Sequence, residues 1–218
     1  MSIDALEHFA EFELQMIALA WMAALYALKI FQLSRLPGAR DKAPGKGSRA
    51  RGVLSAYASA FFPWSMESSR KHIWRWLEFS VYHVGAAAAI LTTFSLPFAP
   101  GMMTPAVRLG MAVPVAAAVL LGILKLWKRV RRPELRLIST PDDYFSLITL
   151  EVFFTSTVIV LLADGALTRV VFFFATAGFL FYVPFSKISH YVYYFFAGVV
   201  TGGRYGQRGT RPALRRAE

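Results

Sequence analysis

The chain has no cysteine and few histidines. None of its 218 residues is a cysteine, and four are histidines. The first absence excludes disulfides, thiolate-bound zinc, iron–sulfur clusters held by this chain and covalently attached c-type haem. The motifs His-Glu-x-x-His and Gly-x-Ser-x-Gly are also missing. No sequence motif therefore supports a membrane enzyme with histidine and glutamate catalysis. Because the chain has no cysteine, redox chemistry would need a non-covalent cofactor.

Charged residues are few and apolar residues dominate. Charged residues make up 17% of the chain and apolar ones 56%, with a mean hydropathy of +0.46. A soluble domain of this size could not bury so much apolar surface. Much of the chain must therefore lie in lipid.

Five apolar segments reach the ~20 residues that a helix needs to cross a bilayer. They cover approximately residues 12–31, 73–97, 107–127, 144–163 and 170–198. The pattern predicts an all-α membrane protein, with one integral-membrane domain over residues 1–218 built as a bundle of five transmembrane helices. The first helix is not a cleavable signal peptide, because acidic residues precede it and no basic stretch does.

The basic residues cluster between alternate apolar segments. They lie mainly within residues 35–51, 70–71, 125–136 and 204–216, and residues 1–13 contain no lysine or arginine. This positive-inside pattern predicts an N-terminus outside and a C-terminus in the cytoplasm. It also accounts for the net charge of +11 without nucleic-acid binding.

Two basic regions lie outside the predicted spans. Residues 34–70 are predicted as a cytoplasmic loop that contains a short interfacial helix over residues 53–64. Residues 202–218 are predicted as a basic C-terminal tail, either solvated or in contact with lipid headgroups or a partner subunit.

Two of the histidines, His83 and His190, lie inside apolar segments. An imidazole in hydrocarbon is costly unless it has a partner, so each indicates a functional site. Counting ~1.5 Å of rise per residue puts both in the inner half of the membrane, where two histidines on separate helices can ligate one haem iron. Alternatively, His72 binds the iron while His83 is merely buried, or both buried histidines form interhelical hydrogen bonds. The remaining histidine, His8, lies on the outer side.

The surroundings of these histidines suit a flat cofactor. Gly85 and the alanines at 86–89 give the second helix a small surface, which lets a macrocycle or a neighbouring helix approach closely. The inner end carries cations that haem propionates would seek, and that the positive-inside pattern also explains. These cations are Arg70, Lys71, Arg75 and Lys187.

Three stretches resemble the gamma subunit of respiratory nitrate reductase, over roughly residues 75–205. They are VPFSKISH at 183–190, YHVG at 82–85 and ISTPD at 138–142. That family is a five-helix, N-outside cytochrome b of the prokaryotic cytoplasmic membrane that oxidises quinol. The resemblance implies haem b bound by His83 and His190, quinone as substrate, and iron–sulfur or catalytic redox subunits as cytoplasmic partners.

The departures from this family concern its second haem. The positions that would carry the outer ligands are Thr93 and Phe172 here, and neither side chain ligates iron in the usual way. The resemblance therefore implies a single-haem relative that is attached to partners other than nitrate reductase.

Two carboxylates, Glu78 and Glu151, lie within apolar sequence. Quinone chemistry couples electrons to protons, so we expect these residues to serve as proton-exchange groups. A structural alternative for Glu78 is an i,i+3 ion pair with Arg75. The leading hypothesis is an electron-transfer subunit between membrane quinone and a cytoplasmic iron–sulfur partner, and the alternative is a non-redox membrane anchor that docks a partner complex.

Overall fold

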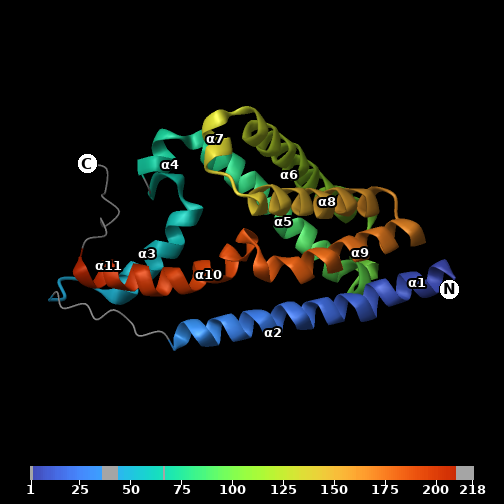
Figure 1. Cartoon of the computed structure of the whole chain (residues 1–218), viewed down its shortest axis with the longest axis horizontal. Helices are drawn as coiled ribbons and strands as arrows, with labels where there is room; N and C mark the ends of the chain where they lie inside the picture. The colour runs from blue at the N-terminus through green and yellow to red at the C-terminus, as the bar shows by residue number, and fades with distance from the viewer. Residues whose placement is uncertain (1, 36–43, 66, 210–218) are drawn as a thin grey trace. The chain divides into compact units, whose positions relative to one another are not determined.

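The structure is a computed structural model that describes residues 2–35, 44–65 and 67–209, all in helices, turns and connecting segments (Figure 1). Parts of the predicted basic loop and tail, residues 36–43 and 210–218, lie outside the described residues. The chain forms two compact units. The first comprises Met1–Lys29 with Glu78–Ile188, and the second comprises Ile30–Leu77 with Ser189–Glu218.

The prediction of five membrane-spanning helices is confirmed in length and composition. The candidate spans are Ile3–Ser34, Ile73–Phe98, Pro105–Arg131, Pro141–Leu162 and Ala166–Phe185. The first contains α1 (Ile3–His8), a π-helical turn (Phe9–Leu14) and α2 (Gln15–Ser34), and the others contain α5, α6, α8 and α9 in that order. Short helices α4 (Glu67–Lys71) and α7 (Pro133–Leu137) precede α5 and follow α6.

Local sequence signals set where these helices begin. Pro105 and Pro141 occupy the first turns of α6 and α8, where a missing N–H costs nothing. Thr104 accepts from the N–H of Val107 at 3.4 Å. At the start of α8, the N–H of Thr140 donates to Asp143 Oδ2 at 2.8 Å, which satisfies an N-terminal donor.

The core of the first unit lies where α6 packs along α8 and α8 along α9 (Figure 1). Phenylalanines fill it from α8 and α9. Phe154 and Phe172 are fully buried, and the Phe153 ring stacks on Phe179 with ring centroids 5.1 Å apart. Small residues let α5 and α6 approach, since a Cβ on Gly85 would lie 2.5 Å from both Ala118 Cβ and the Pro114 carbonyl oxygen.

Many large apolar side chains of the long helices face outward. Leu91, Val113, Leu120 and Leu162 are each 59–69% exposed. Such a surface is unusual for a soluble bundle and suits contact with acyl chains.

The predicted continuous fifth helix over 170–198 is wrong. Helix α9 ends at Tyr182, and two 3-10 turns, Val183–Phe185 and Lys187–Ser189, separate it from α10 (His190–Ala197). Pro184 lacks an N–H and cannot continue the α-helical bonding pattern. The apolar span consequently ends at Phe185, before His190.

The second unit contains the predicted short helix as α3 (Arg49–Phe61), followed by a 3-10 turn (Pro63–Ser65). Part of the predicted loose tail is ordered instead: α10 continues through a π-helical turn (Gly198–Gly202) into α11 (Gly203–Arg208). This segment packs against α3, because glycines remove the side chains that would separate the two helices.

Candidate functional site

His83 lies on α5, with an exposed side chain. Its ring nitrogen Nδ1 lies 2.8 Å from the backbone carbonyl oxygen of Phe79, one turn earlier. A carbonyl oxygen can only accept, so Nδ1 carries the proton and the lone pair of the ring lies on Nε2. The hydrogen bond thereby fixes the tautomer and restrains the ring, as second-sphere bonds do for metal-ligating histidines.

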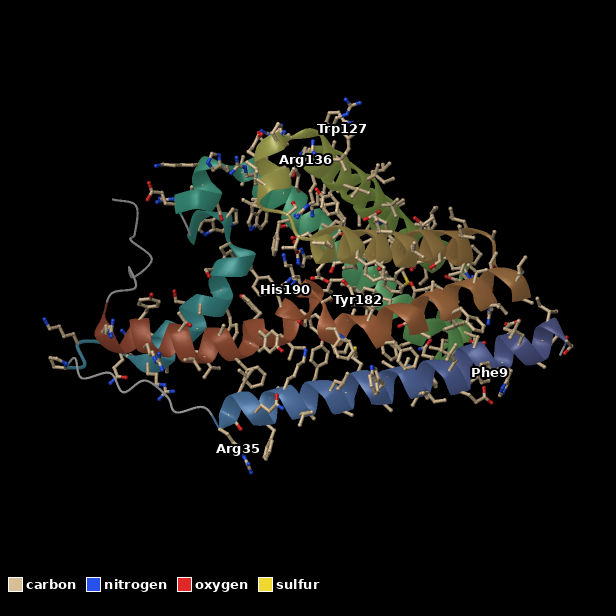
Figure 2. All side chains as sticks on the ribbon, viewed as in Figure 1. Phe9, Arg35, Trp127, Arg136, Tyr182 and His190 are labelled. Atoms are coloured by element: carbon tan, nitrogen blue, oxygen red, sulfur yellow. The ribbon has the colours of Figure 1, made fainter. Side chains whose placement is uncertain are left out.

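His190 is the first residue of α10 and is also exposed. Figure 2 shows it at the start of that helix, with Tyr182 at the end of α9. His83 belongs to the first unit and His190 to the second. Each is therefore placed on its own helix, and their pairing at one depth stays a prediction.

The donor chemistry of His83 suits haem iron. Among the described residues, no three His, Asp or Glu side chains gather as a metal-binding cluster. Haem needs no such cluster, because the macrocycle supplies most of the iron ligands and the protein adds axial ones. An imidazole that is protonated on Nδ1 carries its lone pair on Nε2, the nitrogen that would bind iron as an axial ligand.

The other two histidines lie at helix ends. His72 directly precedes α5 and is exposed, and His8 Nδ1 lies 3.4 Å from Glu13 Oε1. The alternative in which His72 replaces His83 as a ligand stays open.

Glu151 is the centre of a polar cluster inside the first unit, formed by α5, α6 and α8. Its carboxylate lies against Gly122, in the space that a side chain there would fill. Tyr82 Oη donates to Glu151 Oε1 at 3.5 Å, and Lys125 Nζ lies 3.6 Å from the centroid of the Tyr82 ring. The other oxygen, Oε2, is buried without a hydrogen-bond partner among the described residues. A proton on Oε2 would remove the cost of a buried charge.

Glu78 forms an ion pair between α5 and α6. Its Oε1 lies 3.3 Å from Lys128 Nζ, so its partner is Lys128 rather than the predicted Arg75. Along these antiparallel helices, the Glu78–Lys128 pair is followed one turn later by Tyr82 and Lys125. Titratable groups therefore extend from the basic end of α6 to the half-buried Glu151.

The remaining predicted site residues have different surroundings. Gly85 is buried, and the close approach there is made by α6. Lys187 Nζ lies 2.6 Å from Asp143 Oδ2 and 3.0 Å from Thr140 Oγ1. A haem propionate at Lys187 would thus share the lysine with a carboxylate. Arg75 is exposed near the start of α5.

Asp142 holds the break between α9 and α10. Tyr182 Oη donates to Asp142 Oδ1 at 2.5 Å, and the backbone N–H of Lys187 donates to Oδ2 at 3.1 Å. One carboxylate thus bonds the last residue of α9 and the first residue of the second 3-10 turn. Non-helical backbone at membrane depth needs such internal partners.

Side chains of α2 satisfy carbonyl groups near the same break. Trp21 Nε1 donates to the Phe181 carbonyl oxygen at 3.3 Å, and Lys29 Nζ donates to the carbonyl oxygen of Pro184. The Lys29 ammonium also lies 5.7 Å from the centroid of the Phe185 ring. A lysine within the first apolar helix therefore has a structural use.

The two positions to which the resemblance would assign outer-haem ligands, Thr93 and Phe172, are packed. Thr93 is buried and its carbonyl oxygen accepts from Gln15 Nε2 at 2.9 Å. Phe172 is fully buried beside Phe153, with ring centroids 6.2 Å apart. Both residues therefore contact neighbouring helices.

No family model, curated protein or solved structure matches the chain. The resemblance to the nitrate reductase gamma subunit therefore stays an expectation that residues 82–85, 138–142 and 183–190 carry.

Sequence reasoning missed three polar members of these sites. In the sequence, Tyr82 stands out only as part of the YHVG motif, Lys125 is one of many basic residues, and Lys29 has no predicted role. One sequence signal could have identified them: each is a charged or polar residue inside an apolar segment. Burying such a side chain in lipid is costly, so it indicates a function or a paired group.

Proposed function

We propose that the chain is the haem b-containing membrane subunit of a respiratory-type redox complex. It would pass electrons between membrane quinone or quinol and an iron–sulfur partner on the cytoplasmic side. The observation that carries this proposal is the Nδ1–H bond from His83 to the Phe79 carbonyl, which leaves the lone pair on Nε2. Five apolar spans and the resemblance at residues 183–190 support it.

His83 and His190 are the proposed axial ligands. Bound haem would supply reversible one-electron chemistry, and the chain would set its ligand identity, hydrogen bonding and burial. The Phe79 carbonyl holds the His83 ring in one tautomer, and Asp142 bonds the backbone that leads to His190.

Glu151 is the proposed proton-exchange group for quinone chemistry. Its Oε2 is buried, and Tyr82 donates to Oε1, so a proton taken up at Oε2 would leave the Tyr82 bond intact. Lys125 and the Glu78–Lys128 pair lie between this carboxylate and the basic end of α6. They supply groups through which a proton could reach the carboxylate from water.

The orientation follows from the charge pattern. The positive-inside pattern supports an N-terminus outside and a C-terminus in the cytoplasm, and the family resemblance supports a prokaryotic cell. The iron–sulfur partner would dock on the cytoplasmic side, and the cytoplasmic (inner) membrane would be the location.

The test is the absorption spectrum of the purified full-length protein. The proposal expects a reducible b-type Soret and alpha band, with one haem per chain by the pyridine haemochrome assay. His83→Ala and His190→Ala should each abolish or shift these bands, whereas His8→Ala should leave them unchanged. His72→Ala separates the alternative ligand sets, because loss of haem in that variant but not in His83→Ala would move the ligand to His72.

A haem-free protein that still binds a cytoplasmic redox complex would favour the anchor function instead. The exposed arginines at the ends of the described helices would then serve only for docking.

A further inference from the structure

In the second unit, α3 packs against the continuous segment of α10, Gly198–Gly202 and α11 (Figure 1). We call this antiparallel pair the hairpin, although its two sides are remote in sequence. Its helices are antiparallel, because Gly52 lies against Gly206 while Tyr57 lies against Gly198. Contact is so close that a Cβ on Gly206 would lie 2.5 Å from both the Ser48 carbonyl oxygen and Gly52 Cα. Tyr57 Oη donates to the Phe195 carbonyl oxygen at 2.6 Å and closes the other end.

The exposed surface of this hairpin changes in character along its length. At the end where Gly52 meets Gly206, Arg49 and Arg51 of α3 and Arg204 of α11 are exposed. Toward the end where Tyr57 meets Phe195, large apolar side chains are exposed: Leu54 is 70%, Phe61 74% and Phe195 61% exposed. His190, at the start of α10, is an exposed polar residue at this end. Both helices share this order, with arginines at one end and large apolar groups toward the other.

The described part of the second unit is almost uniformly basic. It contains nine lysines and arginines and one acid, Glu67, which lies 2.6 Å from Lys71. The basic residues are Arg35, Lys46, Arg49, Arg51, Arg70, Lys71, Arg75, Arg204 and Arg208. A surface of this charge attracts anions, and its apolar end is not suited to water.

We propose that the hairpin binds the headgroups of anionic phospholipids in one leaflet. Its apolar end would enter the acyl region, and Arg49, Arg51 and Arg204 would contact phosphate groups at the interface. An acidic protein partner would pair with the arginines, but it would leave Leu54 and Phe61 to be covered by something else. A lipid monolayer matches both ends at once, because it presents charge and hydrocarbon in the same order.

The test uses the full-length protein in nanodiscs of phosphatidylcholine, alone or mixed with phosphatidylglycerol. Amide hydrogen exchange is followed for residues 49–61 and 195–208. Exchange should be slower with phosphatidylglycerol, and high salt should remove the difference. Arg49→Gln/Arg51→Gln/Arg204→Gln should lose this protection by phosphatidylglycerol. Each arginine removed should weaken binding of the hairpin to the anionic lipid by on the order of fivefold.

The matched control is Arg131→Gln/Arg132→Gln/Arg136→Gln, which removes three exposed charges from the first unit, at the end of α6 and in α7. It should keep the lipid effect on the hairpin, and circular dichroism should show the same helix content in both variants. Equal exchange of the wild-type hairpin in both lipids would overturn the proposal. Protection that requires a bound cytoplasmic protein, whatever the lipid, would also overturn it and assign the surface to that protein. Neither result depends on haem, so this test is independent of the proposed electron transfer.

Discussion

The carboxylate of Glu151 occupies the volume that a side chain on Gly122 would fill. The two residues lie on α8 and α6, the most extensively packed helix pair of the first unit. A glycine here does not serve backbone freedom, since the chain is helical. It makes room for a half-buried acid whose Oε2 is buried.

Gly122→Ala should displace Glu151 while leaving the fold intact. The clash is with the end of a flexible side chain, so the backbone need not move, and alanine gains roughly 0.8–1 kcal/mol in helix propensity. We expect a melting temperature within about 2–4 °C of wild type but faster labelling of Glu151 by a hydrophobic carbodiimide, measured by mass spectrometry.

Gly110→Ala is the control for this variant, because it lies on the same helix with open space around it. It should leave the labelling rate of Glu151 at the wild-type value. If Gly122→Ala also labels at that rate, the carboxylate does not depend on the space at Gly122.

Gly52→Ala should open the hairpin of the second unit. Here the new methyl group would meet backbone, the carbonyl oxygen of Gly202, which cannot rotate away. Overpacking of this kind costs about 1–3 kcal/mol. Amide exchange in α3 and α11 should therefore accelerate, whereas Gly45→Ala, with its nearest neighbour at an ordinary 3.5 Å, should change little.

Asp142→Ala should destabilise the break between α9 and α10. The substitution removes the Asp142 acceptor from Tyr182 Oη, which keeps its contact with Ser146 Oγ at 2.8 Å, and from the Lys187 N–H. We expect a loss of about 0.5–1.5 kcal/mol for each hydrogen bond. Asp142→Asn keeps one acceptor oxygen and should lose less. Amide exchange over residues 183–189 reports the effect, and unchanged exchange in Asp142→Ala would show that the carboxylate does not hold this segment.

The five spans could be predicted because hydropathy and helix length are properties of contiguous sequence. The break after α9 could not be predicted, although the sequence contains Pro184. Membrane helices tolerate proline when neighbouring residues satisfy the backbone groups that lose their hydrogen bonds. Those neighbours, Lys29 and Asp142, are remote in sequence. Their roles depend on which helices pack together, and hydropathy does not reveal that.

The hairpin of the second unit likewise depends on packing partners that are remote in sequence. Glycines at 198, 202 and 206 recur every fourth residue, a spacing that favours close helix packing. The partner stripe on α3, with Gly52 and Ala56, lies more than a hundred residues earlier. The sequence nevertheless predicts a basic tail from residue 202, and only the structure identifies α3 as the packing partner of these glycines. For the same reason, sequence could place Glu151 in the membrane but could not connect it with Tyr82 and Gly122.

Asp164 lies in the turn between α8 and α9. Its carboxylate accepts from Arg169 Nε at 2.7 Å and from Arg108 Nη2 at 2.7 Å. The hydrogen bond from Arg169 is the main reason why the pKa of Asp164 lies below its ordinary value of 3.8, and burial opposes it. A lowered pKa in the folded state means that the pair stabilises the fold above pH 3.8 and that this contribution disappears as the pH falls through the lower folded value.

Asp164→Asn should therefore lower the melting temperature at neutral pH and converge with wild type in acid. The side chain is 30% exposed, so solvent screening limits the loss to about 1 kcal/mol, or about 2–4 °C. Melting curves between neutral pH and pH values below 3.8 measure the difference. Glu67→Gln removes an exposed ion pair with Lys71 and should shift the melting temperature by less. A gap between Asp164→Asn and wild type that persists undiminished in acid would mean that the ionised carboxylate is not its source.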